Sequence, residues 1–132
     1  MLSEQIYTGQ GKRTARRVLD TQPFTVEVSF EDRGKLLGLE GATIGTYTTS
    51  PRADGTLAGE GRGIFATADG EVITWKGIGT GRLKPGGAVS YRGALTFNAS
   101  SQRLSRLNTI AGMFEFEVDE AGITNTQIWE WK

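Results

Sequence analysis

Glu115 and Glu117 stand two residues apart near the end of the chain, a spacing that places both carboxylates on one face of a β-strand. Paired carboxylates can divide acid and base roles when their environments differ. The neighbouring residues Phe114, Phe116 and Val118 form the opposite, apolar face. Because that apolar face must be buried, the alternation predicts that both glutamates point into solvent as an ordinary charged surface.

Histidine and cysteine are both absent from the sequence. Their absence excludes disulfides, thiolate zinc sites, cysteine nucleophiles and histidine-based triads. Acid–base chemistry would therefore fall to Asp, Glu, Lys or Tyr side chains. A metal ion would need a site made only of oxygen ligands, and no dense Asp cluster resembles one. We therefore expect no metal ion and no cofactor.

The stretch from Thr56 to Asn98 predicts three consecutive antiparallel strands, at residues 56–66, 72–83 and 88–98. Glycines alternate along the first two of these strands, at Gly59, Gly61 and Gly63 and at Gly77, Gly79 and Gly81. Such glycines remove the side chains from one face and are typical of a sheet that coils sharply, as a closing barrel does. A glycine-rich phosphate loop is the alternative, but the helix that it requires does not follow.

The first turn of this stretch sets an expected pairing. If Asp69 and Gly70 form a two-residue type I′ turn, Ile64 lies opposite Trp75. Ile73 and Trp75 then lie on the outer face among charged residues. An apolar pair on a polar face indicates a subunit contact. We therefore expect a homodimer or a higher homo-oligomer.

The second turn, with Lys84 opposite Gly87, puts Tyr91 across from Thr80. The face assigned to the interior is the more apolar one, and a slip of one residue would invert it. The residues on that face are Leu57, Phe65, Thr74, Lys76, Ile78, Thr80, Val89, Tyr91, Leu95 and Phe97.

The last hairpin provides further interior residues. Its expected pairing places Phe114, Phe116 and Val118 across from Gln127, Asn125 and Ile123, with Trp129 and Trp131 continuing the same aromatic face. A mainly apolar cavity with a few polar groups is typical of a small-molecule site. The candidate ligand-binding residues are therefore Tyr91, Lys76, Gln127, Trp129 and Asn125. The alternative is a filled barrel, in which Tyr91 bonds a buried amide and Lys76 reaches the barrel mouth.

The rest of the chain completes the strand count. Residues 6–19 predict a polar, locally basic strand, and residues 24–31 alternate strictly, with Phe24, Val26, Val28 and Phe30 on one face. Further strands are indicated at 43–49, 110–118 and 123–131, and a single helical turn at 100–108 across the barrel end. The sequence therefore predicts an all-β fold over one domain, residues 1–132. Its form is an antiparallel up-and-down β-barrel of about eight strands with at most one short helical turn.

Charge and hydropathy limit the partners. Fifteen Lys and Arg residues balance fifteen Asp and Glu residues, so the formal net charge is zero. We therefore expect neither nucleic acid nor membrane as a partner. The chain contains no apolar run of 18 residues, and its first residues lack the apolar stretch of a secretory signal. A cytoplasmic location is the resulting expectation.

The later half of the chain resembles a known family. The runs GEGRGIFATADGEVITWKGIGTGRL, SYRGALTF, RLSRLNTIAGMFEFEVDEAG and IWEWK, within residues 56–132, are similar to small uncharacterised bacterial proteins with the barrel fold named after plant allene oxide cyclase. The resemblance implies an antiparallel eight-stranded barrel, commonly oligomeric, and no assigned reaction. The catalytic residues of the plant cyclase do not align with positions in this chain.

Three functions remain open from the sequence. The first is the binding of a small apolar or amphipathic molecule in the barrel interior. The second is a cyclase or isomerase that shapes and desolvates an apolar substrate, which needs neither histidine nor cysteine. Related barrels that close rings in polyenes suggest it by analogy of fold. The third is a filled barrel with a structural or assembly role. The sequence leaves open whether the protein is an enzyme, and a cavity would separate the first two functions from the third.

Overall fold

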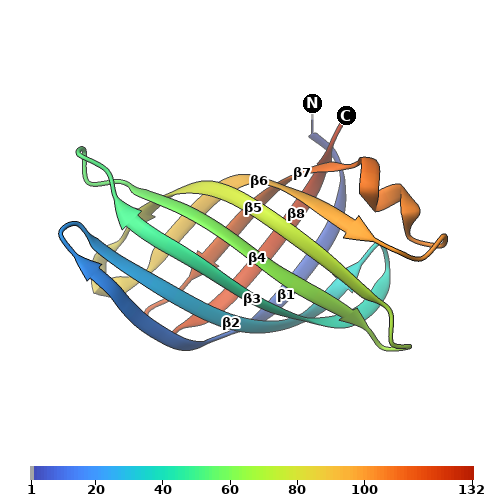
Figure 1. The fold of residues 1–132 in the computed structure, drawn as a ribbon, viewed down its shortest axis with the longest axis horizontal. Coiled ribbons are helices and arrows are strands. Elements are labelled where there is room, and N and C mark those ends of the chain that lie inside the picture. The colour runs from blue at the N-terminus through green and yellow to red at the C-terminus, as the bar shows by residue number, and fades with distance from the viewer. Residues whose placement is uncertain (1) are drawn as a thin grey trace.

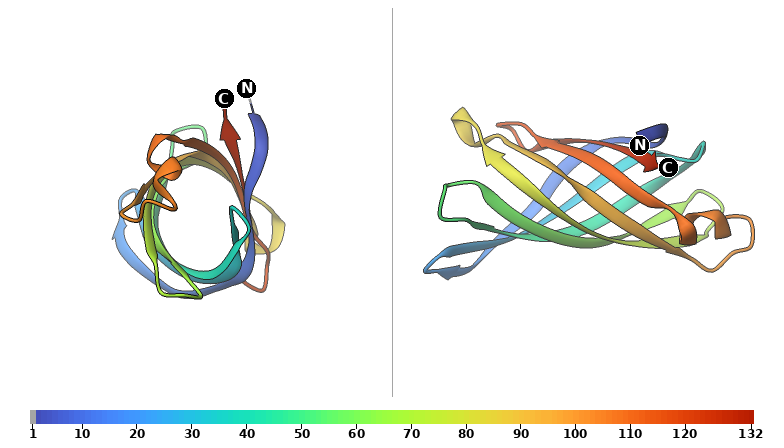
Figure 2. Two further views of the ribbon diagram at one scale, coloured as in Figure 1. Left: turned by 90° about the vertical axis from the view of Figure 1, so that its right-hand side faces the viewer. Right: turned by 90° about the horizontal axis from the view of Figure 1, so that it is seen from above.

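The computed structural model describes residues 2–132 and shows one closed barrel of eight antiparallel strands in sequence order. Figure 1 shows the strands crossing the barrel obliquely, and one view in Figure 2 looks along it. The fold prediction is confirmed. The strands are β1 Leu2–Thr21, β2 Phe24–Leu36, β3 Leu39–Pro51, β4 Leu57–Thr67, β5 Val72–Leu83, β6 Val89–Ala99, β7 Ala111–Val118 and β8 Ile123–Trp131. Two 3₁₀ turns, η1 Pro85–Gly87 and η2 Ser105–Thr109, complete the described elements.

One end of the barrel is covered by the segment that contains η2. Leu104, Leu107 and Ile110 are buried in the core there, as the predicted helical turn across the barrel end requires. The Asn108 side chain fixes the segment to the end of β6. It accepts a hydrogen bond from the Ala99 N–H at 2.7 Å and donates one to the Ala99 carbonyl at 2.9 Å.

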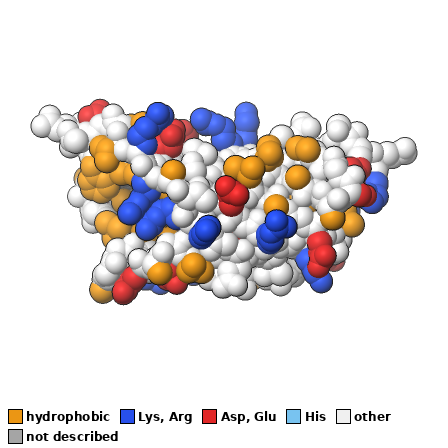
Figure 3. All heavy atoms as spheres, turned by 90° about the horizontal axis from the view of Figure 1, so that it is seen from below, with side chains coloured by type: hydrophobic (Ala, Val, Ile, Leu, Met, Phe, Trp, Pro, Cys, Tyr) orange, Lys and Arg blue, Asp and Glu red, His pale blue; other side chains and the backbone are white. Residues whose placement is uncertain are grey.

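The opposite end carries the long β1–β2 hairpin. β1 pairs with β8 only as far as Lys12 but continues along β2 to Thr21, so the hairpin extends beyond the closed part of the barrel. Phe24 lies on the apolar face predicted for residues 24–31, yet it is 43% exposed for this reason, and Val18 is 65% exposed. Figure 3 shows apolar side chains beside Lys and Arg at this end of the molecule.

The β4–β5 turn differs from the two-residue turn expected at Asp69 and Gly70. The Gly70 N–H donates to the Thr67 carbonyl at 3.0 Å, and the Thr67 N–H donates to the Glu71 carbonyl at 2.8 Å. The loop is therefore three residues long, and Gly70, with φ +94, occupies its left-handed position. The extra residue shifts the pairing by one.

That shift inverts the predicted faces of β5. Trp75 pairs with Gly63 rather than with Ile64, and Ile73 is buried in the core. Ile73 and Trp75 therefore point inward, while Lys76 and Ile78 point outward. The expected apolar pair on the outer face is wrong. These two residues therefore no longer support a homo-oligomer, which stays a prediction.

The same turn geometry recurs in the next two hairpins. Lys84 N–H donates to the Ala88 carbonyl at 2.8 Å, and Asp119 N–H donates to the Ile123 carbonyl at 2.9 Å. Each loop is again three residues, with Gly87 at φ +89 and Gly122 at φ +87. The expected pairings are therefore each wrong by one residue.

The corrected pairings decide which residues of β6 and β8 point inward. Tyr91 lies across from Gly81 rather than Thr80 and keeps its predicted inward position. On β8, Thr126 lies across from Phe116 and Ile128 across from Phe114, so that face of β8 is the inner one. The neighbouring residues Asn125, Gln127 and Trp129 consequently lie on the outer face.

Candidate functional site

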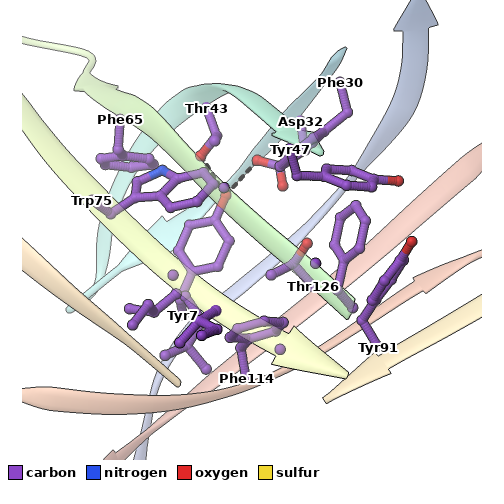
Figure 4. A pocket seen from close by; sticks show the side chains of 18 of the residues that line it. Tyr7, Phe30, Asp32, Thr43, Tyr47, Phe65, Trp75, Tyr91, Phe114 and Thr126 are labelled. Atoms are coloured by element: carbon purple, nitrogen blue, oxygen red, sulfur yellow. Dashed lines mark hydrogen bonds between the residues drawn. The ribbon is translucent and has the colours of Figure 1, made fainter. Parts of the chain in front are cut away.

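A cavity of about 90 Å³ lies within the barrel. Aromatic rings from seven of the eight strands gather around it, and Figure 4 shows most of them pointing into the same region. Trp75 and Phe114 remain partly uncovered although both point inward, because they border this space. The aromatic residues that line the space are Tyr7, Phe30, Tyr47, Phe65, Trp75, Tyr91, Phe97, Phe114 and Phe116.

One wall of the cavity is bare backbone. Gly59 and Gly61 on β4 pair directly with Gly79 and Gly77 on β5, and all four border the cavity. The alternate glycines of the sequence therefore share the inner face. Their missing side chains leave room for the aromatic residues of neighbouring strands.

The rings pack against one another on the side toward the β1–β2 hairpin. Phe30 lies 4.9 Å from Phe116, measured between ring centroids, and Tyr47 lies 5.5 Å from Tyr91 in an edge-on arrangement. Tyr47 also meets Phe116 edge-on at 5.6 Å. Such offset and edge-on pairs are favourable beyond the area that they bury, so this part of the wall is well ordered by its own contacts.

A polar cluster interrupts the apolar lining at one place. Asp32 follows Phe30 on the inner face of β2 and is only 4% exposed. The Tyr7 hydroxyl donates a hydrogen bond to Asp32 Oδ1 at 2.5 Å. Because the Tyr7 hydrogen is used in this way, the Thr43 hydroxyl donates to the Tyr7 oxygen, 3.2 Å away. Figure 4 shows both bonds at the edge of the cavity.

Burial raises the pKa of Asp32 above its ordinary value of 3.8, although the hydroxyls of Tyr7, Thr43 and Thr126 act in the opposite direction. Burial and the charge on Asp32 both raise the pKa of Tyr7, so its hydroxyl stays protonated. The hydrogen bond of 2.5 Å between them is at the short end of the range for a hydroxyl donor and an oxygen acceptor. The pair therefore forms a hydrogen-bonded acid at the wall of an apolar cavity.

The cluster contains one unused polar atom. The Thr126 oxygen is buried and near enough to Asp32 to favour its ionised form, yet it has no hydrogen-bond partner within residues 2–132. The Asp32 carboxyl forms no ion pair with any described Lys or Arg. No group of three acidic side chains in the described chain lies close enough together to hold a metal ion.

Of the five predicted site residues, only Tyr91 lies inside the barrel. Its hydroxyl donates to Thr49 Oγ1 at 3.0 Å, and its ring borders the cavity. The interior position predicted for the other four is wrong, because the three-residue turns shift their strands by one. These four residues, on the outer face, are Lys76, Asn125, Gln127 and Trp129. Whether Tyr91 contacts a ligand stays a prediction.

Sequence reasoning missed the polar cluster itself. The two-residue alternation that places Val28 and Phe30 inward continues to Asp32. This continuation is the sequence signal that could have placed Asp32 in the interior. Tyr7 could not be assigned, because a register shift between Gln5 and Tyr7 in the β1–β8 pairing breaks the two-residue period there.

Glu115 and Glu117 lie on the outer face, as predicted. Arg92 contacts both, with Nη1 2.5 Å from Glu117 Oε2 and Nε 3.7 Å from Glu115 Oε2. Ser90 also donates to Glu117 at 2.6 Å. Although partial burial acts against them, hydrogen bonds from Arg92, Ser90 and Lys84 lower the pKa of Glu117. Glu117 is therefore an ionised surface group, and Glu115 lies beside it on the outer face.

The fold is similar to those of small β-barrel proteins whose structures are solved. A protein of unknown function from Clostridium acetobutylicum is 11% identical, with a TM-score of 0.83 over 99% of this chain and 98% of its own. A β-barrel-like protein from Acinetobacter baumannii is 14% identical, with a TM-score of 0.83 over 100% and 96%. An enzyme from Penicillium herquei is 16% identical, with a TM-score of 0.68 over 96% and 92%.

These likenesses define the class of protein by fold alone. The chain is a small closed β-barrel of a kind found in bacterial proteins, two of which are of unknown function. No family model matches its sequence, and no curated protein matches it. Within residues 2–132, neither helical turn is long and apolar enough to span a membrane. The cytoplasmic location stays a prediction.

Proposed function

We propose that the protein binds a small, mainly apolar molecule inside the barrel. The observation that supports this function is the aromatic cavity of about 90 Å³, with its polar atoms gathered at Asp32. Apolar walls with a few convergent polar groups are the usual character of a ligand site. A barrel filled for structural purposes alone has no need of a buried carboxyl, which costs free energy wherever it is charged.

The cavity limits the size of the ligand. A cavity of about 150 Å³ accommodates benzene in a protein core, and the space here is smaller. A ligand of about five heavy atoms would fit as the rings now stand. A larger one would require Trp75 or Phe114, both partly uncovered, to turn aside.

The test is calorimetric titration with tert-butanol and with benzene, supported by the shift in melting temperature. Gly59→Val should weaken binding at least tenfold, because a Cβ at Gly59 has only ordinary contacts, the nearest at 3.4 Å from Tyr91, and its methyl groups would enter the cavity. Arg62→Val is the matched control, since the Arg62 side chain is exposed on the same strand and does not border the cavity. If the control weakens binding equally, the interior is not the site.

A second candidate function is an isomerase or cyclase, as barrels resembling that of allene oxide cyclase allow. The observation that favours it is a hydrogen-bonded pair of acids, Asp32 and Tyr7, beside an apolar space. A buried carboxylate there could remove a proton next to a carbonyl group. The test is deuterium incorporation into acetone in heavy water. Catalysis that disappears in Asp32→Asn would support the activity, and exchange equal to that in buffer alone would contradict it.

A further inference from the structure

We infer that the ligand of the barrel is a small organic cation, an amine or ammonium group on a short apolar body, held by Asp32 among the aromatic rings. The inference rests on the proposed function, because it names the chemistry of a ligand in the same cavity. Three features of the cavity carry it: a carboxyl without a countercharge, a wall of aromatic rings, and a lining without cationic side chains.

The first feature is the missing countercharge. Asp32 is 4% exposed, and its polar contacts within the described chain come from hydroxyl groups. A buried charge is usually paired, because isolated ions are strongly disfavoured away from water. Hydroxyls compensate a carboxylate only in part, so the site is electrically incomplete. A bound cation would supply the opposite charge.

The second feature is the ring wall that shares the cavity with Asp32. Phe30, two residues away on β2, lies 6.4 Å from Trp75 between ring centroids, and both border the space. The faces of aromatic rings attract cations, and Trp is the strongest of them. Clusters of rings around an ammonium group are a recurrent form of cation recognition. Rings and carboxylate together therefore favour positive charge.

The third feature excludes other ligands. No Lys or Arg lines the cavity, so a carboxylate or phosphate ligand would meet Asp32 without any compensation. Lys76 cannot pair with an anionic ligand in the cavity, because its side chain points outward. A purely apolar ligand would leave the Thr126 oxygen without a partner. An ammonium N–H can donate to both Asp32 and Thr126.

The experiment compares tert-butylamine, charged at pH 8, with tert-butanol, which has the same shape and no charge. Calorimetry on the wild-type protein should show the ammonium form binding at least tenfold more tightly. Asp32→Asn should remove this preference while tert-butanol still binds. Glu115→Gln, which removes a carboxylate from the outer face of the barrel, should leave the preference unchanged.

The outcomes separate the two proposals. If the amine and the alcohol bind the wild-type protein equally well, the cation inference is overturned and the binding function stands. If neither compound binds and benzene does not bind either, the binding function itself fails. Should Asp32→Asn not fold, Trp75→Leu provides a second test, because loss of the ring should weaken the amine more than the alcohol.

Discussion

Gly63 and Trp75 lie directly opposite each other on β4 and β5, and the indole ring folds back over the glycine. A Cβ at Gly63 would stand 2.4 Å from Trp75 Cζ2 and 2.6 Å from the Ile44 carbonyl oxygen. The missing side chain lets the ring lie along the wall instead of across the lumen. Tyr7 lies over Gly9 and Gly34 in the same way. The glycines therefore keep the centre of an aromatic barrel open.

Gly63→Ala should destabilise the protein by about 1–3 kcal/mol, the usual cost of overpacking. The Ile44 carbonyl belongs to the backbone and cannot turn aside. Gly59→Ala, on the same strand and the same face, is the matched control. Its nearest neighbour would be 3.4 Å away, so its free energy of unfolding should stay within about 0.5 kcal/mol of wild type. Urea unfolding of both variants measures the difference, and equal losses would contradict the packing described here.

Asp32→Asn should change how stability depends on pH. Burial raises the pKa of Asp32 in the folded protein above its value in the unfolded chain. Between the two pKa values the folded protein binds more protons, so the free energy of unfolding falls as pH rises through that interval. Because the Asn side chain does not titrate, the variant does not lose stability at this position as the pH rises. It should therefore exceed wild type in stability at pH 7 and lose the advantage below about pH 3.

Urea unfolding at a series of pH values checks this behaviour. Asp54→Asn is the control with the opposite sign, because hydrogen bonds from Thr56 lower the pKa of Asp54. The wild-type protein should have a higher free energy of unfolding than this variant at neutral pH, and the difference should shrink as the pH falls. A wild-type protein that gains stability relative to Asp32→Asn between pH 4 and pH 7 would show that Asp32 is stabilised by its surroundings rather than strained.

Tyr7→Phe should raise the pKa of Asp32 further, because the Tyr7 hydrogen bond acts to lower it. The variant also leaves buried polar groups on Asp32 and Thr43 without their partner, which costs about 1–3 kcal/mol. A titration of the Asp32 carboxyl carbon by NMR measures the pKa. Tyr91→Phe is the control, since it breaks a buried bond to Thr49 and should leave the Asp32 titration where it was. If the Asp32 pKa does not shift in Tyr7→Phe, Tyr7 does not form the hydrogen bond to Asp32 described here.

The sequence predicted the barrel, its strand count and its inner aromatic residues on β2, β6 and β7, because alternation and turn composition are local signals. It did not predict the faces of β5 and β8, because these depend on the length of each turn. The three hairpin turns described above each have a glycine with positive φ at the fourth position, Gly70, Gly87 and Gly122. The β3–β4 turn, in which the Arg52 N–H donates to the Thr56 carbonyl, has Gly55 at the same position. That repeated glycine is the signal for a three-residue loop. One additional residue in the loop moved Lys76 and Gln127 from the interior to the surface.

The Asp32 cluster was hidden for a different reason. A carboxylate on an apolar face violates the local pattern, and functional sites are where such violations are expected. Its partner Tyr7 follows a register shift in β1, which breaks the two-residue period. The β1–β2 pairing brings Tyr7 to Asp32, and the closure of β1 onto β8 brings Thr126 to the same side of the barrel.

The affinity for tert-butylammonium should depend on pH through Asp32. Below the pKa of this carboxyl the site is neutral, and binding a cation must expel one proton. The affinity should therefore rise up to tenfold per pH unit until Asp32 is ionised. It should then stay constant until the amine itself loses its proton at about pH 10. The affinity for tert-butanol should not rise, because a neutral ligand gains nothing from the charge. The test is titration of both compounds from pH 4 to pH 9, with Asp32→Asn as the variant in which the rise disappears. Parallel curves for the amine and the alcohol would place the charge dependence elsewhere in the protein.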